Sequence, residues 1–473
     1  MLGQAAGSRL VSVVLGLIAA TLVAWGQEPS PQEPSSTIKV EVKQVLVPVI
    51  VTDQRGHHVT GLAARDFRVF EEGVGQQIVA FGTEMLDAPT TLPAANSAVP
   101  QPSAAAIPVA SPLPVAPPRR TYVVCLDALN SSFANFSRVR EALSKLFQQE
   151  RSTDSQYALL VLGRSIAVVK YLTPRGEDIL AAMRSKELDR AAMQSETANF
   201  AEQERHLGSL LDKYCTQCGC GGFRSAKDID KAMDSGGICG GILNNIMNFA
   251  ASAARERSLV GRQFIRNLRT LTEQLGQQPG KRILLLVSDG FSLWAGRDLY
   301  AAIGAYLGTP AVIQTNPGER LGQEIEELAR LASSLNVSIY ALDSRGIPAP
   351  TFGVFDAEGE HAFATHAQQT LPDLIQQRSM VATEKQDGMI LLAATTGGVF
   401  VGNTNDLLRG MRQAFADGRE YYVLAYVPTN RAADGQFRKI RVEVKDKKVT
   451  VRAKHGYWAP SPPPPPGPSP LHQ

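Results

Sequence analysis

The first structured region that the hydrophobic pattern predicts is a run of short strands. Residues 38–51, IKVEVKQVLVPVIV, alternate apolar with other side chains and lead into a polar turn, and two further short strands flank Gly73. Alternation of this kind predicts strands with one buried face. The sequence therefore predicts an N-terminal β module over residues 38–84, which is too small to be stable without a partner surface.

From Arg120 onward the pattern changes to short apolar strands that alternate with amphipathic helices. Strands are predicted at residues 122–126, 157–162, 166–171, 283–287, 337–342 and 398–401, and helices at 138–149, 324–335, 389–394 and 407–416. Strands that are apolar on both faces and separated by helices are typical of a mostly parallel sheet covered on both sides. The predicted fold class is therefore α/β, a doubly wound Rossmann-type sheet over residues 120–420.

Several segments interrupt or flank this α/β region. A helical insertion that contains Gly and Cys is predicted at 185–250, and a long irregular loop at 344–385. Residues 421–458 return to β alternation, and we expect them to form an accessory β-sandwich-like module with the N-terminal strands. The Pro/Ala-rich stretch 85–119 reads as a linker and the Pro-rich stretch 459–473 as a tail.

Composition and charge exclude some classes of binding partner. The chain has 473 residues, 44% of them hydrophobic, and a net charge of +3. Such a small and dispersed excess of positive charge does not indicate a nucleic-acid or polybasic membrane surface. Enzyme signatures such as Gly-x-Ser-x-Gly, His-Glu-x-x-His and a phosphate-binding Gly-rich loop are missing, which favours a binding function over catalysis.

The N-terminus is expected to direct export. Residues 1–26 combine Arg9 with the apolar run 10–25 and end in small residues, which is the pattern of a cleaved signal peptide. An uncleaved anchor is the alternative. No later segment is apolar enough to span a membrane, so we expect a protein that is secreted, periplasmic or at the cell surface.

Four of the five cysteines lie in the predicted insertion. These are Cys215, Cys218, Cys220 and Cys239. In an exported protein they are expected to form two disulfides of open connectivity, and a zinc site is the alternative. Cys125 is expected to be a small buried core residue.

Two predicted strands end on an aspartate. Asp127 ends the strand of YVVCLDALNSSF, Asp289 ends the strand of ILLLVSDG, and Ser131 follows Asp127. Ligands of doubly wound sheets bind beyond the carboxyl ends of the strands, where the strand order reverses. Two carboxylates that meet there favour a cation such as Mg²⁺, Ca²⁺ or Mn²⁺ between them. The alternative interpretation is that both aspartates cap the helices that follow.

This arrangement resembles the metal-ion-dependent adhesion site of von Willebrand factor type A domains, whose first strand carries Asp-x-Ser-x-Ser and whose fourth ends at Asp-Gly. Asp127, Ser131 and Asp289 match that pattern, and Leu129 replaces a coordinating hydroxyl. A further hydroxyl ligand is implied, with three open candidates in the insertion, Thr216, Ser225 and Ser235.

The resemblance extends over roughly residues 38–458 through an ordered set of motifs. After the N-terminal β module come VVCLDALNSS, VSDG, IYALDSRG, ATTGGVF and YYVLAYVP. The set is similar to that of the exported von Willebrand factor A-related proteins common in Acidobacteria, and the order of the motifs rather than any single one is specific.

The resemblance implies a non-enzymatic adhesion or protein-binding module with a degenerate metal site. The site would hold a divalent cation weakly or not at all, and an acidic group of a protein ligand would complete the coordination. One alternative is a metal-independent structural or assembly protein of the cell envelope. Another is a metal-dependent hydrolase that uses Asp127 and Asp289 with a metal-bound water.

Overall fold

The computed structural model describes residues 44–84, 119–219, 222–309, 311–347 and 371–461. The predicted signal peptide, residues 85–118 of the predicted linker and residues 462–473 of the predicted tail lie outside the described residues. Within the described ranges, none of the helices combines the length and the apolar character of a membrane span.

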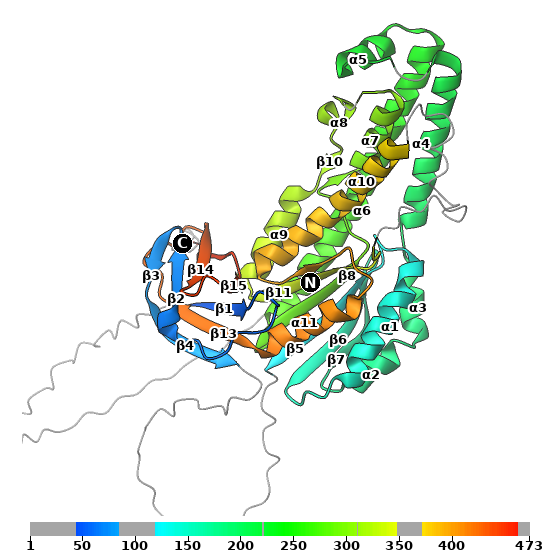
Figure 1. The fold of residues 1–473 in the computed structure, drawn as a ribbon. Helices are drawn as coiled ribbons and strands as arrows, with labels where there is room; N and C mark the ends of the chain where they lie inside the picture. The colour runs from blue at the N-terminus through cyan, green and yellow to red at the C-terminus, as the bar shows by residue number, and fades with distance from the viewer. Residues whose placement is uncertain (1–43, 85–118, 220–221, 310, 348–370, 462–473) are drawn as a thin grey trace, which may run out of the picture. The chain divides into compact units, whose positions relative to one another are not determined.

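A six-stranded sheet forms the centre of the α/β region (Figure 1). Its strands, in chain order, are β5 (Arg120–Asp127), β6 (Ser155–Leu162), β7 (Ile166–Thr173), β8 (Lys281–Ser288), β11 (Val337–Asp343) and β12 (Phe400–Val401). The spatial order is β12-β11-β8-β5-β6-β7, and only β7 runs antiparallel to its neighbour in this sheet. The predicted mostly parallel α/β sheet is thus confirmed.

Helices cover both faces of this sheet, as Figure 1 shows. One face packs against α1 (Phe133–Gln149), α2 (Gly176–Ala182), α3 (Lys186–Ala192) and α11 (Leu407–Arg419), and the other against α6 (Gly237–Gly276), α9 (Gly322–Ser334) and α10 (Leu371–Thr396). Alternate side chains of β5 enter the two cores: Tyr122 and Val124 face the first, and Val123 and Cys125 face the second. Cys125 is a buried free cysteine, as the sequence predicts.

The insertion between β7 and β8 builds a helical region with a core of its own. Its elements are α4 (Thr197–Cys218), α5 (Ala226–Asp234) and the first half of α6, joined by β9 (Trp294–Ala295), α7 (Arg297–Tyr306), α8 (Ala311–Thr315) and β10 (Glu319–Arg320). Helix α6 runs across the predicted end of the insertion at residue 250. A disulfide joins Cys218 to Cys239 with 5.8 Å between their Cα atoms. Cys215 is also disulfide-bonded, and Cys220 lies outside the described residues.

The loop predicted over residues 371–385 is wrong, whereas the helix predicted at 389–394 is confirmed as part of a longer helix. The sequence predicts an irregular loop up to 385 and a short helix at 389–394, whereas α10 is continuous from Leu371 to Thr396. The helix contains Pro372 and Gly388, residue types that disfavour a helix interior. Proline is tolerated in a first helical turn, where its missing N–H needs no partner. At Gly388 a Cβ would lie 2.4 Å from the Phe291 ring, so the glycine permits close packing instead of ending the helix.

The remaining strands form two four-stranded antiparallel sheets that share one core. They are β1 (Val45–Thr52), β2 (Phe67–Glu71), β3 (Val74–Gln76), β4 (Ile78–Glu84), β13 (Tyr421–Tyr426), β14 (Phe437–Val444), β15 (Thr450–Ala453) and β16 (Gly456–Trp458), and a short 3₁₀ helix, Ala64–Asp66, precedes β2. The sheet orders are β15-β1-β13-β4 and β16-β14-β2-β3. N-terminal and C-terminal strands therefore complete each other's sheets, and we call this pair of sheets the β module.

A buried carboxylate joins the β module to the α/β sheet. Asp417 of α11 is fully buried and accepts hydrogen bonds from His58 Nε2 at 2.7 Å and from the Tyr340 hydroxyl at 2.8 Å. Arg452 of β15 forms an ion pair with it at 2.8 Å. Burial alone would raise the pKa of Asp417, but the hydrogen bond from His58 and the charge of Arg452 outweigh it, and the pKa is lowered. The charged form is therefore the stable one.

We expect Asp417→Ala to lower the free energy of unfolding by about 3–5 kcal/mol, because it leaves buried partners of a charge unpaired. Asp406→Ala is the matched control on the same helix, where an exposed N-cap carboxylate accepts from the Arg409 N–H, and should cost about 1 kcal/mol. Denaturant unfolding of both variants provides the comparison. Equal losses would contradict the role given to Asp417.

Candidate functional site

Three adjacent parallel strands end at one edge of the six-stranded sheet. Leu126 of β5 lies opposite Val287 of β8, and Asp343 of β11 lies opposite Ser288 of β8. The chain order reverses between β5 and β8, which makes this edge the switch point where doubly wound sheets bind ligands. Asp127 and Asp289 are therefore brought to neighbouring strand ends, as the sequence predicts.

Asp127 is fully buried, and both of its carboxylate oxygens accept hydrogen bonds. Oδ1 accepts the backbone N–H groups of Leu129 at 3.0 Å and Asn130 at 3.1 Å. Oδ2 accepts the Ser288 hydroxyl at 2.6 Å and the Asn130 side-chain amide at 2.9 Å. Burial raises the pKa of Asp127 to about 6, although the hydrogen bonds from Ser288 and Asn130 work in the opposite direction.

Asp289 and Ser131 connect β8 to the loop that follows β5. The Ser131 hydroxyl accepts the Asp289 N–H at 2.9 Å. Oδ2 of Asp289 accepts the N–H of Ser132 and the side-chain amide of Asn135, each at 2.8 Å. Ser132 is the N-cap residue of α1, the helix that follows β5. The Asp289 carboxylate, which follows the neighbouring strand β8, therefore lies at the N-terminus of α1. A negative charge is favourable there.

The third strand end adds groups that the sequence analysis did not assign to the site. The Ser344 hydroxyl, directly after β11, donates to Oδ1 of Asp289 at 2.6 Å. Asp343 is buried and accepts from Arg345 and from the Gln386 side chain. A usable signal was present in IYALDSRG, because this third apolar strand also ends on Asp followed by Ser.

The Gly after Asp289 is required by the local geometry. Gly290 has φ +99°, and a Cβ there would lie 2.4 Å from the carbonyl oxygen of Lys385. Only glycine fits both the backbone angle and this close approach of α10. The Asp-Gly pair therefore reflects packing as well as any ligand chemistry.

Leu129 faces the core instead of the strand ends. It is 1% exposed and belongs to the cluster that includes Phe264 and Phe291 on the α6 and α9 side of the sheet. A side chain at this position is thus part of the hydrophobic packing. This explains why an apolar residue stands where the resemblance would place a hydroxyl ligand.

The three candidate hydroxyls of the insertion are bonded elsewhere. Thr216 and Ser235 donate to carbonyl groups one helical turn before them, and Ser225 caps α5. The structure instead brings Ser195 to the loop after β5, where its hydroxyl donates to the Ser131 carbonyl at 2.8 Å and contacts the Thr197 hydroxyl at 2.7 Å. Position in the sequence could not reveal this, because the connection between α3 and α4 folds back onto the loop.

Asp127, Ser131, Asp289 and Ser344 form a strand-end cluster in which the carboxylates are paired with hydrogen-bond donors of the protein itself. Every carboxylate oxygen of Asp127 and Asp289 accepts at least one protein hydrogen bond. No group of three or more His, Cys, Asp or Glu residues suited to a metal ion occurs among the residues that the structure describes. The donor set that could contribute to a cation site is that predicted from the sequence, Asp127, Ser131 and Asp289, with Ser344 added.

Comparison with known proteins does not assign the chain to a family. No protein-family model matches it, and no curated protein matches it. Among solved structures, the conserved hypothetical protein BatB from Bacteroides thetaiotaomicron is 13% identical, over 63% of this chain and 98% of that one, with a TM-score of 0.27.

Two further solved structures are similar at the same level. An aerotolerance-related membrane protein from Bacteroides fragilis is 10% identical, over 62% of this chain and 97% of that one, with a TM-score of 0.28. The pilus adhesin SpaC from Lactobacillus rhamnosus GG is 9% identical, over 86% of this chain and 49% of that one, with a TM-score of 0.29. Similarity of this degree is too low to assign a fold family or a function.

We expect Leu129→Ser to lower the free energy of unfolding by about 2–5 kcal/mol, because it removes a fully buried side chain from the core. Leu129→Met keeps the volume and should cost less than about 1.5 kcal/mol. Chemical denaturation of both variants measures the difference. An unchanged stability of Leu129→Ser would mean that the side chain faces the strand ends, contrary to the structure.

Proposed function

We propose that this chain is an exported, non-enzymatic protein-binding module with a von Willebrand factor A-like domain, acting in adhesion or assembly at the cell surface or in the periplasm. We propose further that its strand ends are held by hydrogen bonds and need no cation. The observation that carries this proposal is the hydrogen bonding of Asp127 and Asp289, whose four carboxylate oxygens all accept from protein donors.

A cation at the strand ends would compete with hydrogen bonds that already stabilise the two carboxylates. A buried carboxylate is stable only when its oxygens are paired. Here Asn130, Asn135 and the serine hydroxyls supply that pairing, and the raised pKa of Asp127 means that burial disfavours its charged form. Three of the four carboxylate oxygens accept two hydrogen bonds each, so a divalent cation would have to replace donors there, and Leu129 contributes no oxygen. The network therefore supports rigid loops at the binding edge without a metal.

The cation-dependent form of this function is the second candidate. In it, Mg²⁺, Ca²⁺ or Mn²⁺ is bound weakly by Asp127, Ser131 and Asp289, and an acidic group of a protein ligand completes the coordination. The specific observation in its favour is that two carboxylates and two serine hydroxyls converge at one strand edge. A hydrolase that uses the same pair of aspartates is the third candidate function.

Calorimetry with each of the three cations separates these forms. We expect no saturable heat for the wild type, and no difference between it and Asp289→Ala or the exposed control Asp446→Ala. Saturable heat that is lost only in Asp289→Ala would establish the cation-dependent form.

The binding function itself is tested with the native envelope fraction. We expect the purified protein to retain the same specific proteins with and without a chelator. If it retains nothing beyond an unrelated control protein, the binding function is wrong. Turnover on a panel of phosphoesters or peptides that is lost in Asp289→Ala would establish a hydrolase instead.

A further inference from the structure

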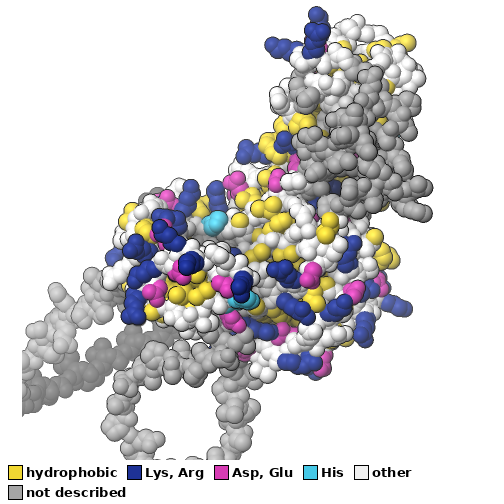
Figure 2. Space-filling view, in the orientation of Figure 1, with side chains coloured by type: hydrophobic (Ala, Val, Ile, Leu, Met, Phe, Trp, Pro, Cys, Tyr) yellow, Lys and Arg dark blue, Asp and Glu magenta, His cyan; other side chains and the backbone are white. Residues whose placement is uncertain are grey.

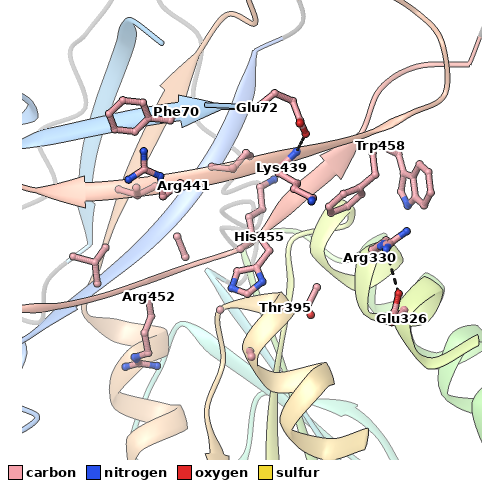
Figure 3. A pocket seen from close by; sticks show the side chains of 18 of the residues that line it. Phe70, Glu72, Glu326, Arg330, Thr395, Lys439, Arg441, Arg452, His455 and Trp458 are labelled. Carbon is pink, nitrogen blue, oxygen red and sulfur yellow. Dashed lines mark hydrogen bonds and ion pairs between the residues drawn. The ribbon is translucent and has the colours of Figure 1, made fainter. Parts of the chain in front are cut away.

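A groove of about 1110 Å³ lies between the β module and the helices α9 and α10. One wall consists of Glu326 and Arg330 of α9 and Thr395 of α10, and the other consists of β14, β15, the end of β16 and the turn after β2. Figure 3 shows Phe70 and Arg441 towards one end, Arg330 and Trp458 towards the other, and His455 between them. The groove is separate from the strand-end cluster of Asp127 and Asp289.

Positive charge predominates in this groove. Its lining includes five Lys or Arg residues and one His, against the two acidic residues Glu72 and Glu326, and the basic residues are Arg330, Lys439, Arg441, Arg452, Lys454 and His455. Residues 437–458 alone contain eight Lys or Arg and two Asp or Glu, a net of +6 from 8 − 2, although the whole chain carries +3. Figure 2 shows dark blue side chains gathered over the strands of the β module.

Carboxylates pair with three of these basic residues: Glu326 with Arg330, Glu443 with Arg441, and the buried Asp417 with Arg452. Lys439 is exposed, and its side chain forms no ion pair with the two glutamates of the lining. Glu326 pairs with Arg330 at 3.2 Å, and the Glu72 carboxylate accepts the backbone N–H of Lys439 at 2.5 Å. Lys454 is 6% exposed, and its ammonium donates to the neutral side-chain amide of Asn336 at 2.7 Å. Burial, and then the charge of Lys281, lower the pKa of Lys454 to about 7.

Aromatic and apolar side chains line the same groove. Arg441 stacks on Phe70 with 4.4 Å to the ring centroid, and Arg330 lies over Phe437 at 5.5 Å. Trp458 packs edge-on against Phe437 and is 39% exposed. Apolar residues complete the lining, namely Leu391, Ile440, Val442 and Val451. Guanidinium groups held flat on rings are preorganised for carboxylates, while the apolar lining favours hydrocarbon side chains.

We propose that this groove binds an acidic peptide segment of a partner protein, one that carries aromatic or apolar side chains among its Asp and Glu residues. The positive lining matches the carboxylates, and the rings together with the apolar residues match the other side chains. An anionic polysaccharide would satisfy the charges but would leave the apolar lining unused. The inference rests on the proposed protein-binding function and identifies a binding site and partner chemistry for it.

The probe is a random copolymer of glutamate and tyrosine, compared with poly-glutamate and with polygalacturonate by fluorescence anisotropy. We expect the copolymer to bind most tightly. Lys439→Glu should weaken its binding about five- to tenfold by reversing an exposed charge in the groove, and Trp458→Ala roughly tenfold by removing an aromatic contact. The matched control is Lys447→Glu, the same charge change at an exposed position outside the groove lining, which should bind as the wild type does. Circular dichroism and thermal unfolding verify that each variant is folded.

Two results would overturn the proposal. Equal weakening by Lys439→Glu and Lys447→Glu would mean that binding follows overall charge, and tightest binding of polygalacturonate would assign the groove to a polysaccharide. The envelope experiment separates this failure from that of the proposed function. If folded Lys439→Glu and Trp458→Ala proteins still retain the wild-type partners, the protein binds partners through another surface. If the wild type retains none, the protein-binding function itself is wrong.

Discussion

The arrangement of the described chain depends on one buried negative charge, that of Asp417. A carboxylate without solvent is costly, and its stability comes from three groups on three separate elements, His58 in the turn after β1, Tyr340 on β11 and Arg452 on β15. Each group belongs to a different part of the sequence. The charge can therefore be satisfied only when the α/β sheet and both halves of the β module occupy their places.

The groove is a product of the same junction. Further hydrogen bonds extend the junction along α9: the Ser333 hydroxyl donates to the Gly456 carbonyl at 2.8 Å, and the Trp458 N–H donates to the Ser334 hydroxyl at 2.9 Å. The His455 N–H donates to the Thr395 carbonyl at 2.9 Å. Because these bonds fix the backbone of β16 and of the segment before it against two helices, the basic and aromatic side chains of the C-terminal strands stand opposite α9 at a set spacing.

Sequence periodicity was sufficient for the parts of the fold that repeat a simple pattern. The apolar strands of the parallel sheet, and hence the meeting of Asp127 with Asp289, follow from strand ends that share one edge. Periodicity could not give the direction of the Leu129 side chain. Leu129 lies two residues beyond the end of β5, where the loop sets the direction, and this loop turns the side chain into the core. It also failed for residues 371–385 of α10, a helix in which Pro372 and Gly388 are accommodated by position and packing. The basic character of residues 437–458 was readable, but a balanced total charge concealed it.

The pairing of β1 has a consequence for the order in which the chain can fold. Val45 pairs with Tyr426 and Val49 with Ala453, so the earliest strand of the described chain lies between two of the last. Contacts this distant in sequence form slowly, because a long loop must close first. Until β13 and β15 have been synthesised, β1 is an apolar strand with two unpaired edges, the kind of segment that pairs with other chains. A chain released before its C-terminal strands would therefore be prone to aggregation, even if its α/β sheet had folded.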